Sequence, residues 1–195
     1  MDVLVVVATE AEAQYVPAEL SVLITGVGKV SAAVAVAEAL AERSASSTSL
    51  RVVNIGTAGA LRDGLAGTYT PATVINHDLS AELIRAVGIP ATDQLDVAGT
   101  HDIVLATGDS FVADLGRRSV LAEWASLVDM EGFAVAWACS RRGVSCTLVK
   151  HVSDNADDGA LSWSDVVDHS AAELGRWLAD NVVALSASTR DREHE

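Results

Sequence analysis

The sequence is poor in basic residues, and this shortage argues against two classes of partner. Thirteen lysines and arginines stand against 27 aspartates and glutamates in 195 residues, which gives a formal net charge of −14. A surface this acidic repels the phosphate groups of nucleic acids and of anionic lipids. We therefore expect no nucleic-acid partner and no membrane partner.

Cysteine is equally scarce, because the chain contains only Cys139 and Cys146. Two cysteines cannot build a disulfide framework, and their spacing is not that of metal ligands. The five histidines form no HxxEH or HxH pattern, so a bound metal is not expected either. No apolar run is long enough to span a membrane, and no basic segment typical of a signal peptide precedes the first one. The composition predicts a cytoplasmic protein with two buried thiols.

What the chain does have is apolar residues, which make up 50% of the sequence and suffice for a packed core. Short valine-rich runs alternate with alanine-rich segments. We expect strands at residues 3–7, 22–25, 51–55, 72–76, 103–107 and 146–152, and helices at 30–43, 131–142 and 164–186. This alternation predicts an α/β fold, a three-layer α/β/α sandwich with a mixed, largely parallel central sheet. No repeat or break in composition divides the chain, so residues 1–188 form one expected domain and residues 189–195 a frayed, charged tail.

A glycine-rich turn follows the second expected strand, where the chain reads Gly26-Val-Gly28. The motif does not match a nucleotide-binding loop. Leu23 stands where a phosphate loop needs its first glycine, and Ser31 stands where a dinucleotide fingerprint needs its third. A tight turn between strand and helix is the expected role.

Carboxylates follow several of the expected strands, and ligands of such sheets bind at the carboxyl ends of strands. Taken singly, each acid could be an ordinary loop residue. Taken together, one carboxyl group could be an ionised base and another a protonated acid. Cleavage of a glycosidic bond requires such a pair. Phe111 at the same edge could stack against a base. The acids are Glu12, Asp129, Glu131 and Asp154.

The acidic stretch that contains Asp154 could be a calcium-binding loop of the EF-hand type. Such a loop needs ligands at alternate positions, but Ala156 and Ala160 occupy two of them. We expect Asp157 and Asp158 to belong to a solvated loop.

Six strings then carry a resemblance to a known family. In chain order they are VVVATEAEA, TGVGKVSAA, VVNIGTAGAL, ATGDSF, VDMEGFAVAWAC and VKHVSDNAD. With them the chain resembles the nucleoside phosphorylase/nucleosidase superfamily, and most of all the methylthioadenosine/S-adenosylhomocysteine nucleosidases. The resemblance implies a homodimeric hydrolase that takes a small purine nucleoside and needs no cofactor.

The resemblance also implies roles for individual residues around the sugar and the purine. Glu12 matches the glutamate that activates water, and Asp154 matches the acid that protonates purine N7, with Ser153 orienting it. Glu131 matches the acid that holds the ribose hydroxyls, and Met130 the residue beneath the sugar.

Four further positions match residues that bind the substrate. Phe111 matches the ring stacked on the base, and the backbone of Val112 would bind the edge of the base. Thr57 stands near the pocket for the nucleophile, and Asp129 stands where the family often has glutamate. Apart from the resemblance, a place in the core is the default expectation for the tryptophans, although Trp163 follows the acidic loop closely enough to cover the site.

Three alternatives remain open. A phosphorylase would need a basic residue for its phosphate, but no arginine precedes Arg43, so water is the favoured nucleophile. Asp154 favours a 6-aminopurine, yet the string from Met130 to Phe133 resembles futalosine hydrolases. The segments between Glu12 and Val22 and at residues 77–101 are shorter than in typical members of the family. A nucleoside-binding protein without catalytic activity therefore remains an alternative.

Overall fold

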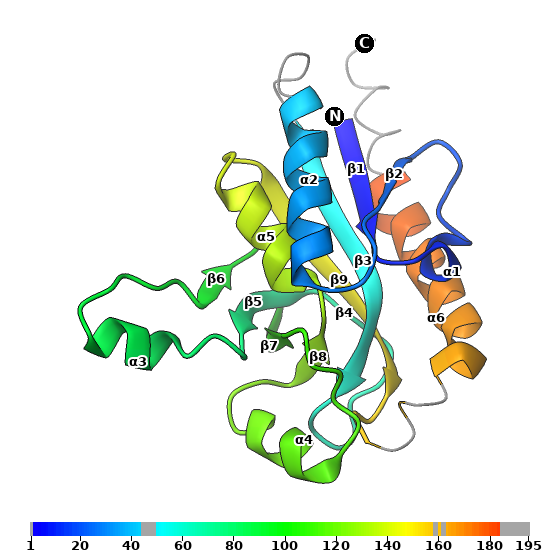
Figure 1. Ribbon diagram of the computed structural model, residues 1–195. Helices are drawn as coiled ribbons and strands as arrows, with labels where there is room; N and C mark the ends of the chain where they lie inside the picture. Colours follow the sequence, from blue (N-terminus) through cyan, green and yellow to red (C-terminus); the bar gives the residue numbers. More distant parts are fainter. Residues whose placement is uncertain (1, 44–49, 158–159, 161–162, 184–195) are drawn as a thin grey trace.

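A computed structural model describes residues 2–43, 50–157, 160 and 163–183 (Figure 1). The predicted tail at residues 189–195, the end of the predicted last helix and Asp158 lie outside these ranges. The strands are β1 (Asp2–Val7), β2 (Ser21–Ile24), β3 (Leu50–Ala60), β4 (Thr68–Tyr69), β5 (Pro71–Asn76), β6 (Gln94–Asp96), β7 (His101–Thr107), β8 (Leu127–Asp129) and β9 (Ser145–Asp154). The helices are α1 (Glu10–Ala13), α2 (Lys29–Arg43), α3 (Ala81–Ala86), α4 (Leu115–Leu121), α5 (Gly132–Ser140) and α6 (Trp163–Leu178), which continues as the π-helical turn Ala179–Val183.

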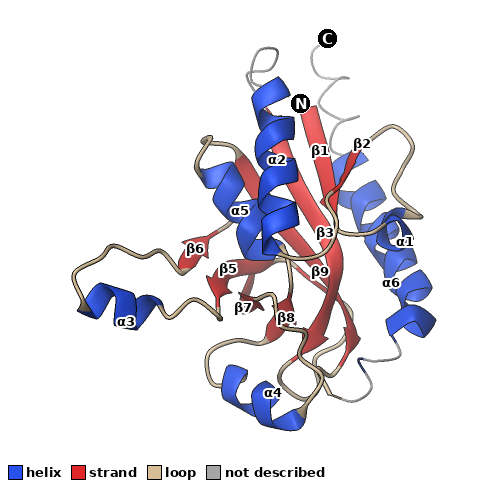
Figure 2. Ribbon diagram, in the orientation of Figure 1, coloured by secondary structure: helices blue, strands red, loops and turns tan. Residues whose placement is uncertain are grey.

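All the described strands belong to one mixed sheet (Figure 2). Its main path runs β2-β1-β3-β8-β7-β5-β6, and β9 lies between β3 and β4. The pairs β1–β2, β1–β3, β3–β9, β5–β7 and β7–β8 are parallel, whereas β3–β8, β4–β9 and β5–β6 are antiparallel. The predicted mixed, largely parallel sheet is therefore confirmed.

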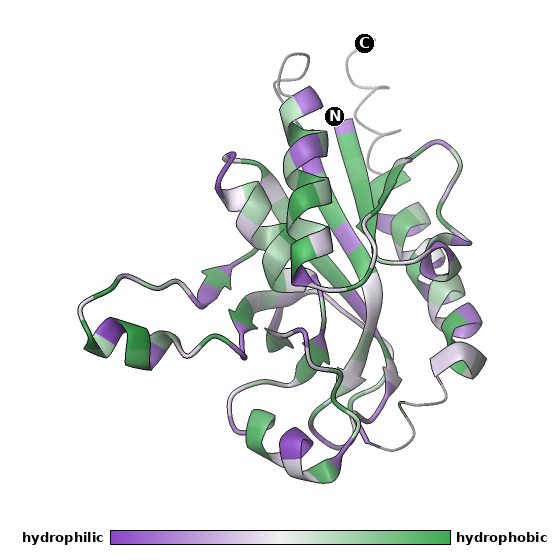
Figure 3. Ribbon diagram, viewed as in Figure 1, coloured by the Kyte–Doolittle hydropathy of each residue, from purple (hydrophilic) through white to green (hydrophobic). Residues whose placement is uncertain are grey.

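Strand β1 shows how the sequence builds both faces of this sheet. Successive side chains of a strand point to opposite faces, so a fully apolar strand needs cover on both. Leu4 and Val6 belong to the core that includes Val36 of α2, whereas Val5 belongs to the core that includes Leu174 of α6. Figure 1 shows α2 and α5 on one side of the central strands and α6 on the other, and Figure 3 shows the apolar character of β1. These layers form the expected α/β/α sandwich.

The structure corrects the sequence-based boundaries at several places. The third strand was expected at residues 51–55, but β3 continues to Ala60. The expected helix at 131–142 spans Gly132–Ser140, with Glu131 as its N-cap and Arg141 as its C-cap, and Gly143 lies just beyond it at φ +65°. The short elements α1, α3, α4, β4, β6 and β8 were not predicted.

The turn at Gly26 and Gly28 has the predicted form. Both residues lie at positive φ, +80° and +94°, a backbone region that favours glycine. The turn leads from β2 directly into α2. Within the ranges given above, no helix combines the length and the apolar character needed to cross a membrane.

Candidate active site

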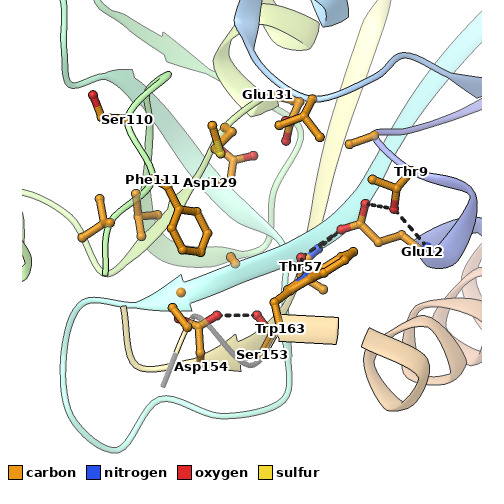
Figure 4. A pocket seen from close by; sticks show the side chains of 18 of the residues that line it. Thr9, Glu12, Thr57, Ser110, Phe111, Asp129, Glu131, Ser153, Asp154 and Trp163 are labelled. Carbon is orange, nitrogen blue, oxygen red and sulfur yellow. Dashed lines mark hydrogen bonds between the residues drawn. The ribbon is translucent and has the colours of Figure 1, made fainter. Parts of the chain in front are cut away.

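A cavity of about 440 Å³ lies where β3, β8 and β9 end (Figure 4). Its volume falls in the range of small-molecule sites. The structure brings together at this cavity all nine residues selected from the sequence, which come from five separate segments of the chain. They are Glu12, Thr57, Phe111, Val112, Asp129, Met130, Glu131, Ser153 and Asp154.

Glu12 is held by donors on both of its carboxylate oxygens. It lies on α1, whose N-cap Thr9 accepts a hydrogen bond from the Glu12 amide and donates its hydroxyl to Glu12 Oε2 at 3.0 Å. On the other side, the backbone N–H and the hydroxyl of Thr57 donate to Glu12 Oε1 at 2.8 and 2.9 Å. The side chain is only 5% exposed, so its remaining accessible surface faces the cavity.

Asp154 reaches the cavity because β9 contains an irregularity next to β3. Ala58 is paired with Val152, but the following Gly59 is paired with Asp154, so Ser153 is an extra residue in the ladder. An extra residue of this kind breaks the alternation of side chains and lets two neighbours face one side. Ser153 and Asp154 both line the cavity, and the Ser153 hydroxyl donates to Asp154 Oδ2 at 2.7 Å.

A tight turn fixes the second oxygen of Asp154. The Ala156 amide donates to Asp154 Oδ1 at 2.7 Å. Ala156 adopts φ +51°, the only positive φ at a non-glycine residue in the described chain, and it is fully buried. Such a conformation is unfavourable for alanine and persists where the surrounding structure enforces it, commonly at functional sites.

Beneath the cavity lies a buried lysine that the sequence analysis had not given a role. Lys150 is 1% exposed, and its Nζ lies 2.9 Å from Asp129 Oδ2. Burial lowers the pKa of Lys150, but the nearby carboxylates of Asp129, Glu131 and Glu12 outweigh burial, and the net effect raises the pKa. The ammonium group therefore balances part of the negative charge that lines the site.

Asp129 is fully engaged in this arrangement. Besides Lys150, it accepts hydrogen bonds from the hydroxyl of Thr107 to Oδ1 at 2.5 Å and from the Gly132 amide to Oδ2 at 2.8 Å. These contacts occupy both carboxylate oxygens. Asp129 thus serves in the structure as the partner of Lys150 and as an anchor for the start of α5.

Glu131 is a carboxyl group of the cavity with a raised pKa. Burial raises its pKa to about 7, and the neighbouring charge of Asp129 adds to this effect, while Lys150 and the Gly28 amide oppose it. The Gly28 N–H donates to Glu131 Oε1 at 2.8 Å. The glycine-rich turn therefore positions a carboxylate of the site rather than a phosphate.

A network of charged residues joins this turn to the loop that carries Phe111. Lys29 forms an ion pair with Asp78 and lies 3.6 Å from Asp109. The Lys29 amide donates to Asp109 Oδ1, and the Asp109 amide donates to Asp78 Oδ2, each at 2.8 Å. These contacts tie together the ends of β5 and β7 and the start of α2 beside the cavity.

Two aromatic rings project into the cavity from different sides (Figure 4). Phe111 is 53% exposed, whereas the following Val112 is buried. Trp163, in the first turn of α6, lines the cavity and donates its indole N–H to the hydroxyl of Thr57 at 2.9 Å. The proximity of Trp163 to the acidic loop is visible in the sequence, whereas its hydrogen bond to Thr57 is not.

One further acid of the acidic stretch, Asp157, can be placed relative to the cavity. Asp157 is half-buried and does not contribute to the cavity lining. The described part of the chain contains no group of three or more histidine, cysteine, aspartate or glutamate side chains arranged to hold a metal ion. Cys139 and Cys146 are both free and buried, as predicted.

The comparisons with known proteins agree with this geometry. The family model described as the phosphorylase superfamily matches residues 69–183. The chain therefore belongs to the phosphorylase superfamily.

Individual relatives within the superfamily carry two kinds of name. An aminodeoxyfutalosine nucleosidase from Helicobacter pylori is 38% identical over 85 residues, covering 42% of this chain and 37% of that protein. The chain covers 54% of the corresponding protein of a second strain. A 5′-methylthioadenosine/S-adenosylhomocysteine nucleosidase from Shewanella halifaxensis is 28% identical over 187 residues, covering 83% of this chain and 78% of the relative.

The fold also matches a solved structure over most of its length. The crystal structure of Helicobacter pylori 5′-methylthioadenosine/S-adenosylhomocysteine nucleosidase superimposes with a TM-score of 0.80, covering 92% of this chain and 97% of that one. The two chains are 20% identical, so this likeness establishes the fold.

Proposed function

We propose that this protein is a purine nucleosidase that hydrolyses the N-glycosidic bond of an adenine nucleoside with a modified or deoxy 5′ position. The observation that carries the proposal is the placement of Glu12, Glu131 and Asp154 around one cavity with the ring of Phe111. The names of the relatives support the same reaction class.

The purine would occupy the side of the cavity formed by Phe111 and Asp154. More than half of Phe111 is exposed, so a stacked base would remove apolar area from water. A protonated Asp154, oriented by Ser153, would donate its proton to purine N7 as the bond from C1′ to N9 breaks. The electron pair of that bond then leaves on a neutral base, which lowers the barrier by about 3–5 kcal/mol.

The sugar and the water would occupy the opposite side. Ionised Glu131 would accept hydrogen bonds from the ribose hydroxyls, with Met130 beneath the ring. Glu12 would take a proton from the water whose oxygen bonds to C1′. The products are free adenine and a ribose that carries the original 5′ group.

The charge of the cavity supports water rather than phosphate as the nucleophile. Among the described residues that line the cavity, none is lysine, arginine or histidine. A phosphate dianion would instead face Glu12 and Glu131. Each pair of like charges at about 4 Å costs about 4 kcal/mol at an effective dielectric constant of 20. Lys150 does not line the cavity and is paired with Asp129, so it is not placed to bind a phosphate oxygen directly.

The test is release of the free purine base, adenine or hypoxanthine, measured by chromatography on a panel of nucleosides with and without phosphate. The panel includes methylthioadenosine, S-adenosylhomocysteine, 5′-deoxyadenosine, inosine, futalosine and aminodeoxyfutalosine. Release that requires phosphate would identify a phosphorylase, and preference for a futalosine would identify that branch. Tight binding without turnover would identify a nucleoside-binding protein.

The variant that tests the mechanism is Asp154→Asn, which we expect to fold and to lose most adenine release. Asp63→Asn is the matched control, because the Asp63 side chain is 96% exposed and lies outside the cavity lining. Full activity in Asp154→Asn would disprove the assigned role.

We further propose that the protein acts as a homodimer in the cytoplasm. Val27, Val30 and Val34 share one face of α2 and its preceding turn, and they are 56%, 74% and 52% exposed. A second copy would cover this apolar face beside the cavity. Sedimentation velocity tests the dimer, with Val30→Glu expected to shift it toward monomer, and cell fractionation tests the compartment.

A further inference from the structure

We infer that Trp163 is a positioning residue for the general base, acting on Glu12 through the hydroxyl of Thr57. The inference rests on the proposed hydrolysis. It starts from a continuous chain of three hydrogen-bonded side chains that joins α6, β3 and α1 across 151 positions of sequence, from Trp163 back to Glu12 (Figure 4).

The direction of each hydrogen bond in this chain follows from the chemistry of its donors. An indole N–H can only donate, so Thr57 Oγ1 must accept at the 2.9 Å contact from Trp163 Nε1. A threonine hydroxyl has a single proton of its own. With one side of the oxygen occupied by the indole, that proton points toward Glu12 Oε1, 2.9 Å away.

The orientation of the Thr57 hydroxyl determines which oxygen of Glu12 can accept a hydrogen bond from water. Oε1 accepts from both the amide and the hydroxyl of Thr57, so both of its lone-pair directions are occupied. Oε2 accepts from Thr9, which leaves one lone pair on that oxygen. The base therefore presents a single acceptor direction, carried by Oε2, to a water molecule in the cavity.

Without the indole N–H, the orientation of the Thr57 hydroxyl proton toward Glu12 is no longer fixed. The Thr57 hydroxyl could then turn its proton away from Glu12 and leave Oε1 free to compete for the water. A base that accepts the proton from the wrong oxygen holds the water at the wrong angle to C1′, which lowers kcat more than it weakens substrate binding.

The experiment is a double-mutant cycle on adenine release. Trp163→Phe keeps an aromatic ring in the cavity wall and removes the N–H together with part of the indole ring system. It is compared in three backgrounds, namely native Thr57, Thr57→Ser, which keeps the hydroxyl, and Thr57→Val, which keeps the shape of threonine without it. Trp177→Phe is the matched control, because Trp177 lies on the same helix and packs against the core on the far side of the sheet from α2.

With native Thr57 and with Thr57→Ser, we expect Trp163→Phe to lower kcat about 3- to 10-fold, the range for one lost hydrogen bond, and to change KM less than about two-fold. In the Thr57→Val background we expect no further loss. Trp177→Phe should keep the native kcat.

Three results would overturn the inference. The first is an unchanged kcat in Trp163→Phe, and the second is the same loss with and without the Thr57 hydroxyl. The third is a loss confined to KM, which would make Trp163 a binding residue only. If Thr57→Val does not fold, the effect of Trp163→Phe on kcat relative to KM in the Thr57→Ser background still tests the inference. If the native protein releases no adenine from any nucleoside, both the proposed function and this inference are overturned. If the native protein is active, the variants test the role of Trp163 separately from the proposed function.

Discussion

The raised pKa of Glu131 predicts that the carboxylate proposed to hold the sugar destabilises the fold at neutral and alkaline pH. The carboxyl group is 9% exposed, and its pKa rises from the ordinary 4.5 to about 7. A carboxyl with a raised pKa in the folded state binds more protons folded than unfolded between these two values. The stability of the fold therefore falls as the pH rises through that window, and the full penalty is present above pH 7.

The size of the penalty follows from the same two values. At 1.36 kcal/mol for each pH unit, the interval from 4.5 to about 7 corresponds to about 3 kcal/mol. Glu131→Gln removes the ionisation while its amide oxygen can still accept from the Gly28 amide. We therefore expect Glu131→Gln to gain stability over the native protein as the pH rises, by less than about 1 kcal/mol at pH 5 and by about 3 kcal/mol at pH 8.

Urea denaturation at pH 5, 6, 7 and 8 measures this difference. The groups that act on Glu131 are Asp129, Lys150 and Glu12, so the native ion pair between Asp129 and Lys150 must stay intact in the variant. A constant offset between the two proteins across the pH series would reflect only the change of side chain. A difference that does not grow with pH, or that shrinks, would refute the reasoning.

Three further predictions concern the same site. KM for a ribonucleoside should fall as the pH rises from 6 to 8, because ionised Glu131 is the better acceptor, and a pH-independent KM in steady-state kinetics would contradict this. Gly59→Ala should lower kcat at least about ten-fold and cost about 1–3 kcal/mol in denaturation, because a Cβ at Gly59 would lie 3.0 Å from Asp154 Oδ1; native kcat would refute it. Lys150→Met should destabilise the protein by about 3–5 kcal/mol by leaving Asp129 buried without its cation, and an unchanged urea midpoint would count against that role.

The sequence predicted the layers of this fold because its long elements obey simple periodicities. The valine-rich β1 and the alanine-rich α2 each keep one composition along their length, so the type and the position of both elements could be predicted from the sequence. The extension of β3 could not be read, because Gly56 and Gly59 resemble a turn. In the structure they are glycines for another reason, since a Cβ at Gly56 would lie 3.2 Å from Lys150 Nζ, and a Cβ at Gly59 would lie 3.0 Å from Asp154. Glycine within a strand often marks such close approach.

The members of the site could be selected from the sequence, but most of their contacts could not. Glu12 and Asp154 follow the strands expected at residues 3–7 and 146–152, and the resemblance supplied the roles that remain proposals here. The spacing from Thr9 to Glu12 is that of a capping box, a local signal that predicts their contact. The bonds from Thr57 to Glu12 and from Trp163 to Thr57 join residues 45 and 106 positions apart. No periodicity in the sequence relates such partners, because the sheet topology alone brings them together.

The position of β9 has a consequence for how the chain is synthesised. This strand lies between β3 and β4, yet it is the last of the described strands in the sequence. Until the ribosome has released residues 145–154, the edge of β3 that faces away from β1, from Arg51 to Gly59, lacks its partner β9. An open, apolar edge of this kind can pair with another chain. Asp154 ends the same strand, so the chain acquires its proposed proton donor only when this vulnerable edge is closed.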